Sequence, residues 1–99
     1  MELKGQLDLL LLSALAHGPS HGYGLIERLR ERSDGVLDYA DSSVYGALRR
    51  LERGGLVASR RSALRRRRVY RLTRSGRRRL ERERKEWALL ARAVARIVG

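Results

Sequence analysis

The chain has 99 residues and a formal net charge of +12, which limits it to a single domain with a small core. It contains no cysteine, which excludes disulfides, cysteine metal sites and thiol switches and suits a reducing cytoplasm. The apolar run Leu9–Ala16 lacks the basic start of a signal peptide and is too short to span a bilayer. We therefore expect a buried helix there and no membrane partner.

The basic residues are concentrated in one block. Between Arg49 and Lys85 there are 17 Lys and Arg residues against 3 acids, whereas the rest of the chain has 6 against 8. Such a block is typical of a polyanion-binding surface. An anionic membrane or a merely solvated surface would tolerate the same charge. Double-stranded nucleic acid is favoured because the block coincides with a predicted helix and a predicted hairpin.

Two helices are expected before this block. Leu3–His17 has apolar residues on nearly every side, so it needs cover from two directions, and a second subunit would supply part of it. Gly18 and Pro19 end this helix. Ser20 is the expected cap of a second helix, His21–Arg32, whose leucines face inward.

The stretch from 41 to 57 contains a third expected helix with a distinctive outer face. Asp41, Ser42 and Ser43 can cap its start, and Gly54 with Gly55 stops it after Arg53. One face is apolar, and the other carries hydroxyls, cations and a glycine: Ser42, Tyr45, Gly46, Arg49 and Arg53, with Ser43 and Arg50 on its flanks. A helix that is only solvated usually mixes both signs of charge. This composition favours a helix that enters a nucleic-acid groove.

A basic hairpin follows. Leu56–Arg61 and Val69–Thr73 alternate apolar and basic residues as strands do. Their loop carries Arg65, Arg66, Arg67 and Arg68, which would follow phosphates or enter a minor groove. The alternative is a solvated or disordered basic loop. A hairpin directly after a groove-binding helix indicates a wing, and the two earlier helices complete a helix-turn-helix.

The last helix begins at Thr73. Leu80, Trp87, Leu90, Val94 and Ile97 follow alternating spacings of three and four residues, which indicates a helix–helix seam. Together with the apolar first helix, this seam predicts a symmetric homodimer.

Individual residues have competing roles. Arg49 can bind a guanine edge with its guanidinium fork, Arg53 is expected on phosphate, and both could be phosphate contacts. Tyr45 either contacts DNA or packs against the second helix, and Gly46 would let the helix approach DNA closely. His17 and His21 do not share a helix face, so a cap or turn role is expected rather than a metal site. No catalytic arrangement and no cofactor motif is present, so we predict no enzyme.

Four stretches in order, LKGQLDLLLLSAL, HGYGLIERL, SSVYGALRRLERGGLV and RRVYRLTRSGRRRL, resemble the PadR-like transcriptional regulators. The resemblance implies a mainly α fold with a small β-hairpin: a winged helix-turn-helix DNA-binding domain over 1–73 and a dimerisation helix over 74–99.

The same resemblance implies a sequence-specific repressor that binds a pseudo-palindromic operator as a homodimer. A small aromatic effector would bind between subunits, against Leu11, Leu15, Trp87 and Leu90. One alternative is a nucleic-acid-binding module without sequence preference, for DNA or RNA. Another is a winged helix used as a protein-interaction scaffold.

Overall fold

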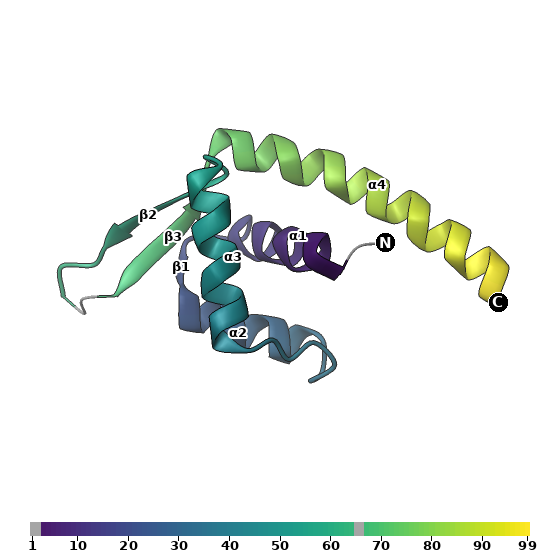
Figure 1. Cartoon of the computed structure of the whole chain (residues 1–99), viewed down its shortest axis with the longest axis horizontal. Coiled ribbons are helices and arrows are strands. Elements are labelled where there is room, and N and C mark those ends of the chain that lie inside the picture. The colour runs from purple at the N-terminus through teal and green to yellow at the C-terminus, as the bar shows by residue number, and fades with distance from the viewer. Residues whose placement is uncertain (1–2, 65–66) are drawn as a thin grey trace.

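A computed structural model describes residues 3–64 and 67–99, and its elements follow the predicted order (Figure 1). The helices are α1 (Leu3–Leu15), α2 (Gly22–Arg32), α3 (Asp41–Arg53) and α4 (Arg74–Val98). The strands are β1 (Ser20–His21), β2 (Val57–Arg61) and β3 (Arg68–Leu72), and they pair antiparallel in the order β1-β3-β2. The mainly helical fold class with a small hairpin is confirmed. Strand β1 was not foreseen.

One apolar core joins the first three helices to the sheet. Leu11 and Leu12 of α1, Leu25 of α2 and Leu48 of α3 are each fully buried. Val57 and Tyr70 close the core from the sheet, and Leu80 closes it from the first half of α4. The β2–β3 hairpin extends from one end of this core, and the second half of α4 extends from the other (Figure 1).

The first helix needs less outside cover than its sequence suggested. Leu7, Leu11, Leu12, Ala14 and Leu15 are all buried within the single chain. Only Leu9 and Leu10 among its leucines from Leu7 onward remain half-exposed. The helix is also shorter than predicted, because 16–18 form a turn. α2, α3 and α4 all pack on it, so one chain covers most of its surface.

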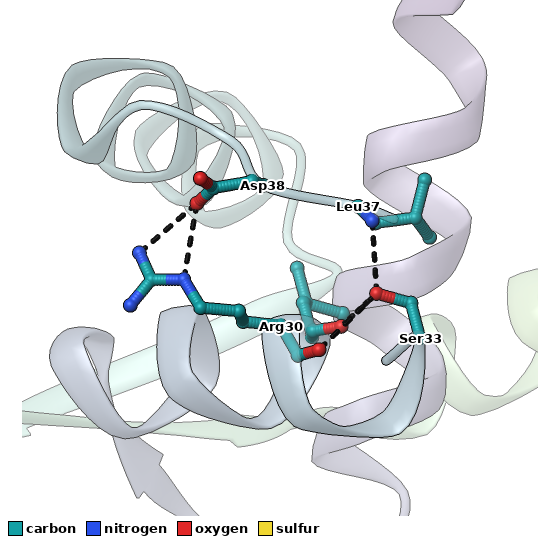
Figure 2. A network of polar contacts seen from close by, with 5 residues as sticks. Arg30, Ser33, Leu37 and Asp38 are labelled. Atoms are coloured by element: carbon teal, nitrogen blue, oxygen red, sulfur yellow. Dashed lines mark hydrogen bonds and ion pairs between the residues drawn. The ribbon is translucent and has the colours of Figure 1, made fainter. Parts of the chain in front are cut away.

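The connection from α2 to α3 is tied back onto α2 (Figure 2). The Ser33 hydroxyl donates to the carbonyl oxygen of Leu29 at 2.8 Å and accepts from the backbone N–H of Leu37 at 2.9 Å. An ion pair between Arg30 and Asp38 at 3.0 Å closes the same loop, although exposed pairs contribute little. The chain is therefore held where it enters α3.

The predicted caps of α2 and α3 are both wrong. His21, rather than Ser20, caps α2: its Nδ1 accepts from the backbone N–H of Gly24 at 3.0 Å. Ala40, rather than the Asp-Ser-Ser cluster, is the N-cap of α3, and it makes no side-chain cap bond. Asp41 lies inside the first turn of α3, where its charge favours the helix dipole. Thr73, where the last helix was expected to begin, is the N-cap of α4 and accepts from the N–H of Gly76 at 3.0 Å.

Gly76 marks the closest approach between α4 and the hairpin. A Cβ at this position would lie 2.0 Å from the carbonyl oxygen of Leu56 and 2.8 Å from Leu72 Cδ1. The same carbonyl accepts from the N–H of Thr73 at 3.2 Å. A backbone oxygen that is already hydrogen-bonded cannot yield cheaply, so this site requires glycine.

We expect Gly76→Ala to destabilise the protein by about 1–3 kcal/mol, as overpacked substitutions do. Gly46→Ala is the matched control, because a Cβ there has no atom within 4 Å. Alanine in place of a mid-helix glycine that has open space at its Cβ position should stabilise by about 1 kcal/mol. Thermal melts at equal protein concentration should therefore move in opposite directions. A Gly76→Ala variant that melts at the wild-type temperature would contradict the close approach.

Candidate nucleic-acid interface

The outer face of α3 is the centre of the candidate interface. Val44, Ala47, Leu48 and Leu51 are 0–4% exposed and hold the helix to the core by one side. The opposite side presents Ser42, Ser43, Tyr45, Arg49 and Arg53 to solvent, with Gly46 between them. The structure thus brings these predicted site residues onto one surface. Their contacts with DNA stay predictions.

Apart from Asp41 at its start, α3 contains one acid, Glu52. The Glu52 side chain lies at the edge of the outer face and points toward the hairpin. Glu52 Oε2 accepts from the Ser59 hydroxyl of β2 at 2.6 Å. Ser59 Oγ in turn accepts from Arg68 Nη1 of β3 at 3.0 Å. This chain of bonds crosses from α3 to both hairpin strands. It gives the Glu52 carboxylate a hydrogen-bond partner and holds the hairpin against the end of α3.

Tyr70 lies beneath this junction. It is 7% exposed and pairs with Ser20 of β1 on one side and Ser59 of β2 on the other. Burial, followed by the nearby Glu52 carboxylate, raises the pKa of Tyr70 above its ordinary value. Its phenol therefore stays neutral and serves as packing under the α3–hairpin junction.

The four hairpin-loop arginines are only partly described. Arg65 and Arg66 lie outside the described residues. Arg67 and Arg68 are exposed, as are Arg60 and Arg61 at the end of β2. These described arginines of the hairpin give the wing a basic surface. Arg68 has the additional structural role of bonding Ser59.

Arg50 has a different partner from the one expected. Its Nη2 lies 3.0 Å from Asp8 Oδ1 of α1, so it joins α3 to α1 instead of extending into the groove face. Burial raises the pKa of Asp8, and the Arg50 cation opposes that rise. The side chain of Arg50 is still 55% exposed in this pair, so its contact with DNA stays a prediction. The spacing of residues within α3 could not show that Asp8 of α1 lies opposite Arg50.

The predicted effector walls separate into two groups. A cleft of about 280 Å³ lies between α1 and α4, and its lining includes Leu9, Glu83, Glu86, Trp87 and Leu90. Trp87 and Leu90 are each 38% exposed. Leu11 and Leu15 are 0% and 3% exposed, so as walls of this cleft they are wrong. They belong to the core beneath, and Leu9 takes their place.

Both histidines contact other parts of the chain. His21 caps α2, which agrees with the expected cap role. The Nε2 atom of His17 lies 3.5 Å from Nη1 of Arg32. Within residues 3–64 and 67–99, no three His, Asp or Glu side chains come together as a metal site would need. In the same part of the chain, no helix is both long enough and apolar enough to cross a membrane.

Sequence reasoning missed the contacts that hold the interface together. These are the Glu52–Ser59–Arg68 bonds, the Asp8–Arg50 pair, and the pairing of β1 with β3. The HGYG motif was the one sequence signal of a close tertiary contact. Two glycines in the first turn of a helix lower its stability, so they indicate a packing reason.

An amphipathic helix with a cationic outer face, braced by two helices and followed by a basic hairpin, defines a winged-helix DNA-binding protein. The family comparison agrees. Residues 11–82 match the family described as "Transcriptional regulator PadR-like family". The chain belongs to the PadR-like family, whose members are DNA-binding transcriptional regulators and not enzymes.

Solved structures support this assignment over nearly the whole chain. A transcriptional regulator from Clostridium thermocellum is 29% identical with a TM-score of 0.92, covering 98% of this chain and 94% of that one. A PadR family regulator from Eggerthella lenta is 31% identical with a TM-score of 0.81, covering 95% of this chain and 82% of that one. No curated protein sequence matches the chain.

A more distant structure includes DNA. Bacillus subtilis PadR in complex with operator DNA is 24% identical with a TM-score of 0.69, and the match covers 77% of this chain and 44% of that one. At this identity the likeness concerns the fold alone.

Proposed function

We propose that this regulator is a sequence-specific repressor that binds a pseudo-palindromic operator as a homodimer. The observation that carries the proposal is the outer face of α3. From Ser42 to Arg53 it presents hydroxyls and cations, and Glu52 is engaged by Ser59 at its edge. This face offers cations to phosphates and hydrogen-bonding groups to base edges, and the Glu52 carboxylate beside it is already bonded to Ser59.

In this proposal residues 1–73 hold the DNA and residues 74–99 hold the partner subunit. Two copies of α3 would enter major grooves about one helical turn, ~34 Å, apart, and each wing would lie on neighbouring backbone. A dimer bound in this way blocks a promoter by occupying it, which is the simplest route to repression. The cytoplasm is the proposed compartment, since a chain without cysteine suits a reducing environment.

The main rival is a module that binds any nucleic acid through charge alone. The two differ in how much binding depends on sequence, because phosphate contacts carry no base information. Fluorescence anisotropy near physiological salt can separate them, with the best sequence from random selection compared with its shuffled form. A preference of about 10³ or more supports a sequence reader. Equal binding would leave only the rival.

Within that experiment, we expect Arg49→Ala to relax sequence preference at one operator position. A bidentate arginine–guanine contact is worth about 1–3 kcal/mol of discrimination, so the preference should fall by about 5- to 150-fold. Arg92→Ala in α4 is the charge-matched control, and it should weaken all sequences slightly or not at all. An unchanged ratio of specific to shuffled binding in Arg49→Ala would remove its base-reading role.

The exposed apolar stripe of α4 supports the dimer. Trp87 and Leu90 are each 38% exposed, Val94 is 48% exposed and Ile97 is 85% exposed. Apolar residues that stay in water along one helix face are typical of an interface. A second copy of α4 would bury this stripe.

We expect Leu90→Glu to produce monomers in sedimentation, because it places a charge inside the stripe. Leu89→Glu is the matched control. Leu89 is 64% exposed and points about 100° away around the helix. The control should remain dimeric at the same concentration. A dimeric Leu90→Glu variant would place the interface elsewhere.

The cleft beside Trp87 supports a small aromatic effector. Trp87 and Leu90 offer apolar surface, whereas the carboxylates of Glu83 and Glu86 line the same cleft. Glu83 is paired with Arg79, one turn earlier in α4, which leaves Glu86 as the freer negative charge. The lining therefore favours a flat aromatic cation over an aromatic carboxylate.

Trp87 is the only tryptophan, so its fluorescence reports this cleft directly. We expect a flat cationic dye to quench Trp87 and to release the protein from its operator, and an aromatic carboxylate of similar size to do neither. Glu86→Gln should weaken dye binding by up to about fivefold, as expected for an exposed charge contact. Quenching without release would deny the cleft a regulatory role.

A further inference from the structure

The first residue of α2 lies directly against the side chain of Tyr45. A Cβ built on Gly22 would lie 2.4 Å from Tyr45 Cε1, 2.7 Å from Cζ and 2.8 Å from the hydroxyl oxygen. No real Cβ approaches other atoms so closely. The outer end of the Tyr45 ring therefore occupies the space that the side chain of any other residue at position 22 would fill.

Backbone conformation does not explain this glycine. The described glycines with positive φ are Gly18, Gly35 and Gly55, so Gly22 adopts angles that any residue can adopt. Glycine also lowers helix stability relative to alanine. The contact with Tyr45 is the one feature on this surface that requires the missing side chain.

Gly22 is itself held firmly in place. The preceding residue, His21, pairs with Val69 of β3 and caps α2 through its bond from the N–H of Gly24. The sheet and the helix cap thus fix the surface on which the ring rests. Tyr45 remains 38% exposed, so the ring is supported on one side and open to solvent on the other.

We infer that Gly22 is a positioning residue for DNA recognition: it seats the Tyr45 ring on α2 and holds the tyrosine hydroxyl in one place beside the outer face of α3. A side chain that is already ordered loses less conformational freedom on binding. The inference rests on the proposed function, because it assigns Tyr45 a contact with the operator. It also joins the two alternatives for Tyr45, since packing on α2 is what prepares the ring for DNA.

A double-mutant cycle tests the inference on the full-length protein. Gly22→Ala, Tyr45→Ala and the combined variant are compared with wild type for affinity to the selected operator, by fluorescence anisotropy. Gly22→Ala should weaken operator binding by about tenfold, within the range for residues in contact. In the Tyr45→Ala background the same change should have no effect, because no ring remains to be displaced.

Gly5→Ala provides the matched control in the first turn of α1. A Cβ there meets no other segment of the chain within 4 Å. This control measures the effect of a methyl group near the start of a helix without touching the Tyr45 ring or the His21 cap. Its effect on affinity should be the same with and without Tyr45.

Melting temperatures complete the cycle. The clashing atoms in Gly22→Ala are the far end of an exposed side chain, so the ring can swing outward and the variant should melt within a few degrees of wild type. If Gly22→Ala alone fails to fold, the added Tyr45→Ala should restore folding, because it removes the ring that the new methyl group strikes. An unfolded double variant would contradict the contact between Gly22 and the Tyr45 ring.

The outcomes for affinity are equally distinct. An equal loss from Gly22→Ala in both backgrounds, or no loss in either, would overturn the positioning role. No loss from Tyr45→Ala would overturn it as well, because the ring would then make no contact that needs positioning. A wild-type protein without sequence preference would defeat the proposed function itself, and the inference with it. Only coupled loss in a sequence-specific protein supports it.

Discussion

The burial of one face of α3 is the constraint on which the rest of the structure depends. Val44, Ala47, Leu48 and Leu51 are packed into the core made by α1, α2 and the sheet. A helix has only one rotation that buries four such residues at once. Burying them therefore determines which side chains remain outside. The hydroxyls, Gly46 and the arginines of the outer face are exposed as a direct consequence of core packing.

The same packing allows the other elements to serve the outer face. The wing is held to α3 by Glu52, Ser59 and Arg68, and the sheet reaches α2 through β1. His21 belongs to both α2 and the sheet, as cap and as strand residue. The outer face of α3, the wing and α2 are therefore joined into one surface. Individually weak bonds hold the basic hairpin beside α3, although the arginines of the two elements repel one another.

The two ends of the molecule differ in how far their apolar residues are buried. The aliphatic residues of α3 are all buried, whereas the second half of α4 leaves its apolar stripe in water. A core of this size cannot cover a helix of 25 residues that extends away from it. The cleft at Trp87 lies where the covered and uncovered parts of α4 meet. A ligand bound there would touch both the subunit core and the stripe proposed for the partner, which makes the position suited to altering dimer geometry.

The sequence by itself determined the elements whose signals are local. The apolar spacing of α3 and α4, the glycine pair after Arg53 and the Thr73 cap are all readable from residues a few positions apart, and so is the concentration of arginine. The PadR-like resemblance identified the family for the same reason, because its motifs are short and lie in order. These features gave the fold class and the face of α3 correctly.

Only the tertiary structure decided which residues meet across the chain. The seating of Tyr45 on Gly22, the capture of Arg50 by Asp8 and the withdrawal of Leu11 and Leu15 into the core each join distant segments. Two-residue β1 carries too little pattern to be recognised, and it forms because β3 offers it a free edge. The caps at His21 and Ala40 depend on where the preceding chain enters the helix. Such choices follow from the packing of whole elements, which local spacing does not encode.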